Sequence, residues 1–229
     1  MERLPLSPLR TVLFPGMPLP LRVFEERYKL MIGRCIEERA PFGVVLIRSG
    51  EEVGGSAEPH EIGTSASIAR VQRLEEGRLN LVALGEQRFR ITSIDDTELY
   101  LVGDVTYLES EDGDSTEAGE QSQRVAGLFG EQFRLRMAIT GQWMRQLDLP
   151  TDSGTLADFV ACQLDAKPET KQELLETLSV TARLRREADL LGDRIRELTE
   201  RWEERRRERF AGSALNWLHR RSLLAPART

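Results

Sequence analysis

The residues that could do chemistry are few and widely spaced in this chain. The only histidines are His60 and His219, too few for an all-histidine zinc site, and the pair His60-Glu61 lacks the second histidine of a zinc-protease helix. The adjacent Asp95 and Asp96 would point to opposite faces of a strand, which does not suit paired acid–base work. We therefore expect no metal site, no cofactor site and no catalytic residue.

Nucleotide and nucleophile chemistry also lack their usual motifs. A Walker A loop places a lysine after a glycine, and the chain has no Gly-Lys pair among its three lysines. It also has no Gly-x-Ser-x-Gly nucleophile elbow. The two cysteines, Cys35 and Cys162, lie far apart, and Cys35 falls on an apolar helix face, so no disulfide framework is expected. We predict neither ATP hydrolysis nor proteolysis, and a cytoplasmic location.

Composition sets wider limits on the class of protein. A chain of 229 residues with 40% hydrophobic residues is typical of one or two soluble globular domains. No apolar run approaches the length of a membrane span. The net charge of −6 argues against a general nucleic-acid binder, although residues 205–229 hold seven arginines and one acidic residue. That basic tail is either a solvated helix end or a patch for a partner.

Hydrophobic alternation predicts a β-rich domain over residues 1–108. The predicted strands are Thr11 to Phe14, Leu21 to Phe24, Phe42 to Arg48, Thr64 to Leu74, Leu79 to Leu84, Gln87 to Ile94 and Tyr100 to Leu108. Gly77 can take the positive φ of a tight hairpin turn. One helix is expected between Glu25 and Arg39, where the apolar period becomes helical. Prolines 15, 18 and 20 place their segment at a sheet edge or a bulge, because proline cannot donate to a ladder.

An acidic linker is predicted at residues 109–120, with a helical bundle over residues 121–229. The linker holds six acidic residues and no large apolar one, so we expect a solvated spacer, with a docking patch for a basic partner as the alternative. The expected helices are Ser122 to Leu147, Thr155 to Leu164, Pro168 to Thr177 and Val180 to about Phe210. Thr155 with Asp158, Pro168 and Ser179 supply their start signals. The predicted fold class is α+β.

The last helix carries an apolar seam with heptad-like spacing. Its members are Leu184, Ala188, Leu191, Ile195, Leu198 and Trp202. Such a seam packs against other helices of the same bundle, or pairs with a second chain as a coiled coil. We expect the first arrangement, and a monomer or weak dimer.

Several motifs together resemble the N-terminal, substrate-recognising domain of Lon proteases. They are the stretch Leu13 to Tyr28 with its Pro-Gly turn and Val-Phe-Glu-x-Arg-Tyr, the segments 42–47, 62–68 and 88–91, and 171–177 in the helical half. The resemblance implies a PUA-like β pseudo-barrel followed by a helical bundle that ends in a long helix. It also implies recognition of protein substrates. The ATPase and peptidase modules of Lon are not expected here, since the chain ends at Thr229 before either begins.

Binding of unfolded or extended protein segments, as an adaptor or holdase, is the function that this resemblance favours. A protease or chaperone would then be a further partner. The side chains that could line an apolar groove are Phe14, Met17, Phe24, Tyr28, Phe42 and Phe89, unless they belong to the core. Met17 is expected to be the most exposed, so Met17→Asp should weaken client binding without lowering the melting temperature. An RNA-associated PUA-like module is the alternative, and a small hydrolase lacks a nucleophile.

Overall fold

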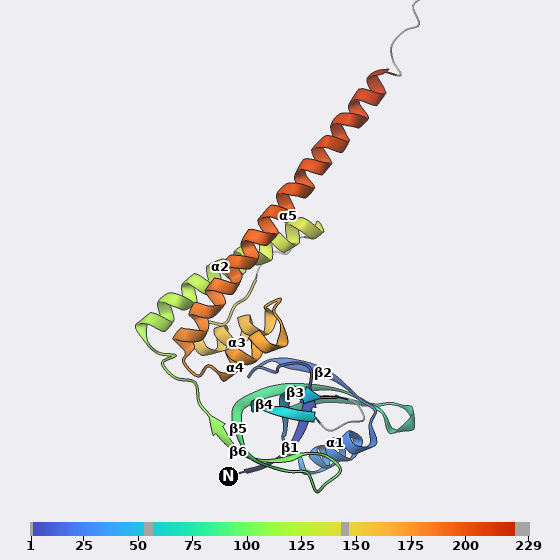
Figure 1. Cartoon of the computed structure of the whole chain (residues 1–229), viewed down its shortest axis with the longest axis vertical. Coiled ribbons are helices and arrows are strands. Elements are labelled where there is room, and N and C mark those ends of the chain that lie inside the picture. The colour runs from blue at the N-terminus through green and yellow to red at the C-terminus, as the bar shows by residue number, and fades with distance from the viewer. Residues whose placement is uncertain (1, 53–56, 143–146, 223–229) are drawn as a thin grey trace, which may run out of the picture.

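The structure, a computed structural model, describes residues 2–52, 57–142 and 147–222, with the backbone alone for 208–222. Its strands are β1 (Glu2–Leu9), β2 (Pro18–Val23), β3 (Phe42–Gly50), β4 (Ala57–Arg73), β5 (Leu79–Asp95) and β6 (Val102–Leu108). Its helices are α1 (Glu26–Glu38), α2 (Thr116–Thr140), α3 (Ser153–Gln163), α4 (Pro168–Glu176) and α5 (Val180–Ser222). The strands form one body and α2 to α5 a second (Figure 1), so the predicted α+β class is confirmed.

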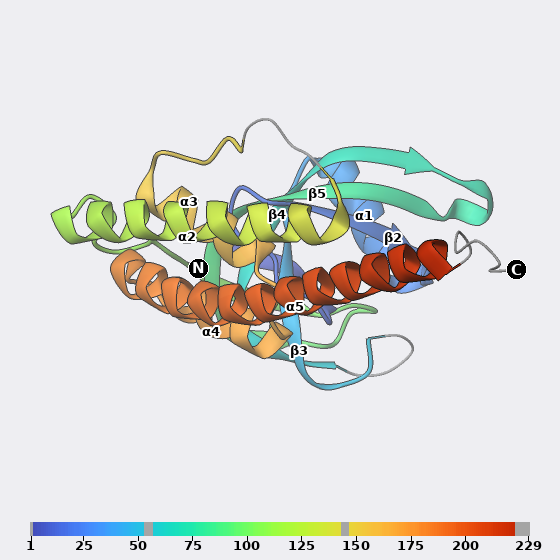
Figure 2. The ribbon, with the colours of Figure 1, turned by 90° about the horizontal axis from the view of Figure 1, so that it is seen from above.

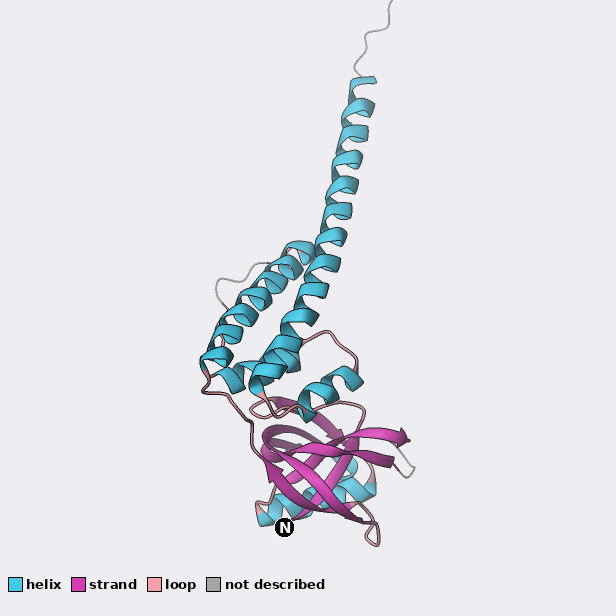
Figure 3. Cartoon of the chain, turned by 60° about the vertical axis from the view of Figure 1, so that its left-hand side comes forward, coloured by secondary structure: helices cyan, strands magenta, loops and turns pink. Residues whose placement is uncertain are grey.

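The strands close into a barrel. The sheet order is β2-β5-β4-β3-β1-β6, and an additional pairing of the last strand, β6, with β5 closes five of the strands into a barrel and leaves β2 at an edge (Figure 3). β1 and β3 run parallel, whereas the other neighbours are antiparallel. Closure depends on β5, whose first half pairs with β2 and whose second half pairs with β6. Register shifts between β4 and β5 let these long strands curl.

The strand predicted at Thr11 to Phe14 is wrong. The first strand is β1, which includes Pro5 and Pro8, and the segment after it leaves the sheet. Phe14 is nevertheless fully buried there, and the carbonyl of Leu13 accepts a hydrogen bond from Thr64 Oγ1 at 2.6 Å. Apolar alternation reports burial, and it does not distinguish a strand from an extended buried loop.

The two strands predicted from Leu79 to Ile94 form the single strand β5. Gly85 within this strand lies against the Pro-Gly corner, and its N–H donates a hydrogen bond to the Met17 carbonyl at 2.9 Å. An added Cβ at Gly85 would lie only 2.3 Å from the Phe14 carbonyl oxygen. Glycine is therefore required by close backbone approach, and the strand passes through it without ending.

The hairpin between β4 and β5 and the helix α1 agree with their predictions. Gly77 has a φ of +68°, as the tight turn requires, and Glu76 beside it has a φ of +59°. Lys29 of α1 donates to the Glu76 carbonyl at 2.8 Å and so ties the hairpin tip to the helix. Cys35 is buried on the apolar face of α1, as expected. This hairpin is consequently held in a fixed position beside α1.

In the helical body, α5 packs along α2, and the two lie side by side in both Figures 1 and 2. The seam residues Leu184, Ala188, Leu191 and Leu198 are buried there, so packing within the bundle is confirmed. α2 begins six residues before the predicted Ser122 and ends at Gly141, whose φ of +70° forms the C-cap. α5 then continues beyond the end of α2 (Figure 1).

The acidic segment is more ordered than the prediction of a solvated spacer implied, although most of its residues are exposed. The Asp112 carboxylate accepts hydrogen bonds from Ser179 Oγ at 2.8 Å and from the Thr181 N–H at 3.3 Å, at the start of α5. Ser115 caps α2 by accepting from the Ala118 N–H. Composition was misleading because these contacts are hydrogen bonds to free N–H groups at helix starts, which need no apolar burial. The division into domains at this segment stays a prediction.

A buried charge network joins the barrel to the helices. Arg88 of β5 donates through Nη1 to Asp158 Oδ2 of α3 at 3.0 Å, pairs with the other carboxylate oxygen through Nη2, and donates through Nε to the Leu175 carbonyl at 3.0 Å. Arg183 of α5, fully buried, lies 3.4 Å from Asp158. Asp158 was expected to help start its helix, but that cap is Asp152. Asp158 therefore forms an ion pair with Arg88 across the interface between the barrel and the helices.

The same network contains a carboxyl group with no hydrogen bond. Glu187 of α5 is fully buried, and neither of its oxygens has a hydrogen-bond partner among the described residues. Burial raises the pKa of this carboxyl well above its ordinary value, and the nearby Arg183 opposes the shift only in part. The folded protein thus holds a proton on Glu187 that the unfolded chain releases. Its stability must fall as the pH rises from the ordinary pKa of glutamate toward the raised one.

Glu187→Gln should remove this pH dependence. We expect the variant to be more stable than the parent by about 1–3 kcal/mol at pH 8, because its neutral amide takes up no proton on folding, and much closer to it at pH 5. Urea unfolding at the two pH values measures the difference. Glu200→Gln, an exposed change on the same helix, is the control and should change neither value. Equal stabilisation at both pH values would contradict the assignment.

Candidate functional site

Most of the residues predicted to line a groove belong to the core. Phe14, Phe42 and Phe89 have no exposed surface, and Met17 is only 8% exposed. The prediction that Met17 is exposed is therefore wrong. Two backbone hydrogen bonds hold this turn against the sheet. The Met17 N–H donates to the Phe14 carbonyl at 3.2 Å, and the Gly85 N–H donates to the Met17 carbonyl. A side chain on a Pro-Gly corner that packs against a sheet is covered by that sheet.

Phe24 and Tyr28 are the two predicted residues that the structure leaves accessible. Phe24 follows β2 and is 49% exposed, and Tyr28 lies partly buried in the first turn of α1. Together with Leu21 they line a small cavity of about 60 Å³ between β2, the end of β1 and α1. The Arg27 guanidinium lies 4.7 Å from the centre of the Tyr28 ring and pairs with Glu25 at 3.1 Å. The arginine thereby fixes the polar rim of the cavity.

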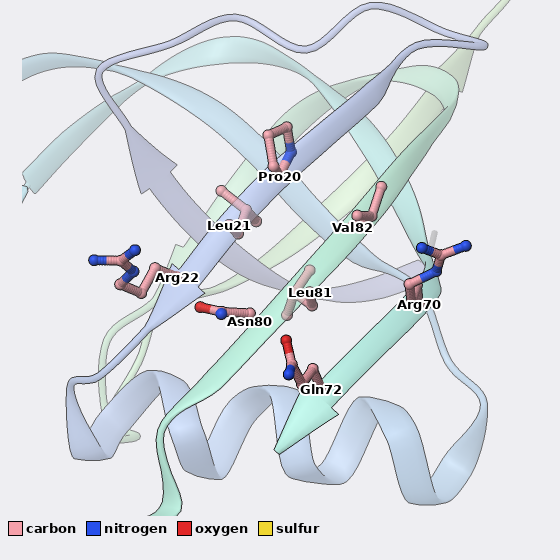
Figure 4. Close-up of a pocket in the computed structure, with 8 residues that line it drawn as sticks. All are labelled: Pro20, Leu21, Arg22, Arg70, Gln72, Asn80, Leu81 and Val82. Carbon is pink, nitrogen blue, oxygen red and sulfur yellow. The ribbon is translucent and has the colours of Figure 1, made fainter. Parts of the chain in front are cut away.

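A second, wider hollow lies on the other side of β2. It has a volume of about 400 Å³ and is formed by β2, β5 and β4 (Figure 4). Its lining residues are Pro20, Leu21, Arg22, Arg70, Gln72, Asn80, Leu81 and Val82. Leu21 and Arg22 line both hollows, so the two lie next to each other at this strand. We call the residues that line them, with the exposed Phe24, the β2 surface.

The strand at the centre of this surface lies at an edge of the sheet. Among the described strands, β2 pairs with β5 alone, which confirms the edge position predicted from the prolines. Pro18 and Pro20 have no N–H group to offer to an incoming strand. A partner at this surface would therefore bind mainly through side chains and not by extending the sheet. Leu84 of β5, 39% exposed, adds apolar area beside the hollow.

The remaining reactive side chains have structural surroundings. His60 lies partly buried with its Nδ1 at 3.4 Å from Glu176 of α4, and His219 lies outside the residues whose side chains are described. Burial raises the pKa of the Cys35 thiol to about 11, and it also raises the pKa of Cys162. Over the described residues, no three His, Cys, Asp or Glu side chains gather as a metal site, and no helix is apolar enough over a sufficient length to cross a membrane.

A closed β-barrel carries two open hollows and is coupled by buried charges to a helical bundle. Comparison with known proteins identifies the class of this fold. The family model of the ATP-dependent protease La (LON) substrate-binding domain matches residues 3–193. The chain belongs to this family, as its sequence motifs had indicated.

Curated relatives are considerably longer than this chain. The Lon protease of Paraburkholderia phytofirmans is 32% identical over 200 residues, which cover 86% of this chain and 25% of the relative. Lon protease 2 of Myxococcus xanthus is 31% identical over 198 residues, covering 85% and 24%. The chain thus spans about a quarter of the length of these relatives.

Solved structures share the fold. The Lon N-terminal domain protein from Xanthomonas campestris superposes with a TM-score of 0.61 at 26% identity, covering 81% of this chain and 96% of that one. The N-terminal domain of the Mycobacterium avium complex Lon protease gives the same TM-score at 23% identity, covering 84% and 99%, and supports the fold alone. The fold expected from the motifs is consequently confirmed.

Proposed function

We propose that this chain is a non-catalytic module that binds exposed apolar or extended segments of client proteins through the β2 surface, as an adaptor or holdase. Family membership supports substrate recognition. The observation that carries the proposal is that two hollows lie next to each other at β2, with the half-exposed Phe24 lining the smaller one. Large aromatic side chains left in water beside an apolar hollow are typical of binding sites.

The geometry of the surface favours clients recognised by shape and apolar contact. Covering Phe24 and Leu84 removes apolar area from water, which is a favourable change for many different sequences. The prolines of β2 limit main-chain pairing, which would otherwise let any extended chain add to the edge and aggregate. Selection then depends on the side chains of the client. Such a surface suits transient binding of unfolded segments.

Phe24→Asp should weaken client binding by roughly tenfold or more, because loss of a central aromatic contact costs about 2 kcal/mol. The probe is fluorescein-labelled lactalbumin, reduced and alkylated with iodoacetamide so that it stays unfolded, and the readout is fluorescence anisotropy. The melting temperature should stay within about 2 °C, since Phe24 is 49% exposed and surface changes cost little.

Leu99→Asp is the matched control. Leu99 is 71% exposed. Its neighbour Glu98 pairs with Arg34 in the second half of α1, whereas Phe24 precedes the start of that helix. This variant should bind the probe as the parent does. Equal weakening by both substitutions, or by neither, would contradict the assignment of the site. Cleavage of casein upon addition of ATP would overturn the non-catalytic part of the proposal.

Salt dependence separates the proposal from the RNA-binding alternative. Apolar client binding should change little between low and high salt, whereas phosphate binding weakens steeply as counterions compete. A labelled RNA that binds the chain more tightly than the unfolded protein at low salt, and dissociates at high salt, would favour the alternative.

A further inference from the structure

The wider hollow of the β2 surface has an ordered arrangement of polar and apolar side chains. The strand register pairs Pro20 with Val82 and Val82 with Arg70. The next row on the same face contains Arg22, Asn80 and Gln72. Side chains of residues paired across neighbouring strands stand on the same face of a sheet. Pro20 and Val82 thus lie beside a row of hydrogen-bond donors, with an arginine on each outer strand (Figure 4).

The charge on this face is unbalanced. Arg22 and Arg70 are the only ionisable residues that line the hollow, and neither has an ion-pair partner in the described parts of the chain. The amides of Asn80 and Gln72 likewise make no side-chain hydrogen bond there. Arg78 at the hairpin differs, since it pairs with Glu76 at 3.4 Å. Although the whole chain has a net charge of −6, this face carries the positive charges of Arg22 and Arg70 beside apolar side chains, with no neighbouring carboxylate among the lining residues.

We propose that this face selects client segments in which carboxylates flank apolar side chains. The inference rests on the proposed function of the β2 surface and deepens it by naming the chemistry of the client. Carboxylates match the planar guanidinium group in charge and geometry, and they accept hydrogen bonds from amides. The apolar side chain of the client lies over Pro20 and Val82. Its acidic neighbours reach Arg22 on one side and Arg70 on the other.

The spacing of the two arginines sets the spacing of the client's acidic residues. Strands in a sheet lie about 4.8 Å apart, so the backbones of β2 and β4, with β5 between them, are about 10 Å apart at this level. Arg70 is also displaced by one row along the strands relative to Arg22. An extended chain advances about 3.3 Å per residue. Acidic residues about four positions apart, with an apolar residue midway between them on the same face of the extended chain, fit this face best.

Three peptides test the proposal with the full chain. They share one apolar centre and differ only at the two flanking positions, which are Glu, Gln or Lys. Anisotropy of the fluorescein-labelled peptides should give affinities in the order Glu, Gln, Lys, with roughly three- to tenfold between Glu and Gln, as expected for two exposed ion pairs. This preference should diminish between 50 mM and 500 mM salt, because exposed charges are screened.

Arg22→Gln combined with Arg70→Gln should bring the ratio of the Glu and Gln peptide affinities to about one. The control combines Arg3→Gln with Arg48→Gln, two exposed arginines paired with Asp95 and Glu58 outside the hollow, and should keep the parent ratio. Melting curves show that both double variants are folded.

Each outcome supports or overturns the inference. If the parent chain binds the Glu and Gln peptides equally, the inference fails and the proposed function stands. If it binds none of the three peptides and also fails to bind unfolded lactalbumin, the proposed function itself fails. If a phosphopeptide or an oligonucleotide binds more tightly than the Glu peptide and loses affinity in the Arg22 and Arg70 double variant, the face recognises phosphate and the carboxylate assignment is wrong.

Discussion

Arg88→Met should lower the free energy of unfolding by about 3–5 kcal/mol, because it leaves the carboxylate of Asp158 buried without its bidentate partner. The same substitution releases the Leu175 carbonyl, which accepts from Arg88 Nε at 3.0 Å. In a protein of this size the melting temperature should fall by roughly 10 °C. Urea unfolding and thermal melting measure the two effects.

Two further variants make this prediction specific. Arg90→Met changes an exposed arginine of the same strand, paired with Glu61 at 3.3 Å, and should cost less than about 1 kcal/mol. Arg88→Met combined with Asp158→Leu should recover little of the lost stability, because the buried Arg183 then loses its ion-pair partner. If Arg88→Met lowered the free energy of unfolding no more than Arg90→Met, the packing of the barrel against the helices would not depend on the Arg88–Asp158 pair.

Local signals in the sequence were sufficient for features that depend on a few neighbouring residues. Gly77 in a short turn, the helical period of α1 and Pro168 at the first position of α4 each indicate a conformation that sterics impose locally. Ser179 caps α5 as predicted, accepting from the Ala182 N–H at 3.1 Å. Such features can be read from one sequence because the determining contacts span only a few positions.

Contacts between distant positions could not be predicted in this way. Arg88 and Asp158 lie 70 residues apart, and nothing in either local pattern indicates that they pair. The order of the acidic segment has the same origin, since Asp112 is fixed by Ser179 and Thr181 across 67 and 69 residues. A single sequence records the charges but not the partner that compensates them.

The candidate site was predicted in part for a similar reason. Aromatic side chains in a β-rich half can line a core or a groove, and alternation shows which residues share a face without showing which face is covered. Phe89 lies inside the barrel, whereas Phe24 follows an edge strand and is 49% exposed. Arg22 and Arg70 were not singled out, because their proximity depends on the register of three strands.

Met17→Asp now has a different expected result from the one predicted on the sequence. Met17 is 8% exposed within the main core, so the variant places a carboxylate among apolar side chains and leaves a cavity. Unfolding free energy should drop by about 3–5 kcal/mol, as for a large core truncation that also buries a polar group. Met17→Leu keeps volume and polarity and should cost less than about 1.5 kcal/mol. Thermal melting, combined with lactalbumin binding measured below the transition, decides between a core role and a client-site role for Met17. An unchanged melting temperature together with lost binding would place Met17 in the client site. The Pro-Gly corner would then have to open toward solvent.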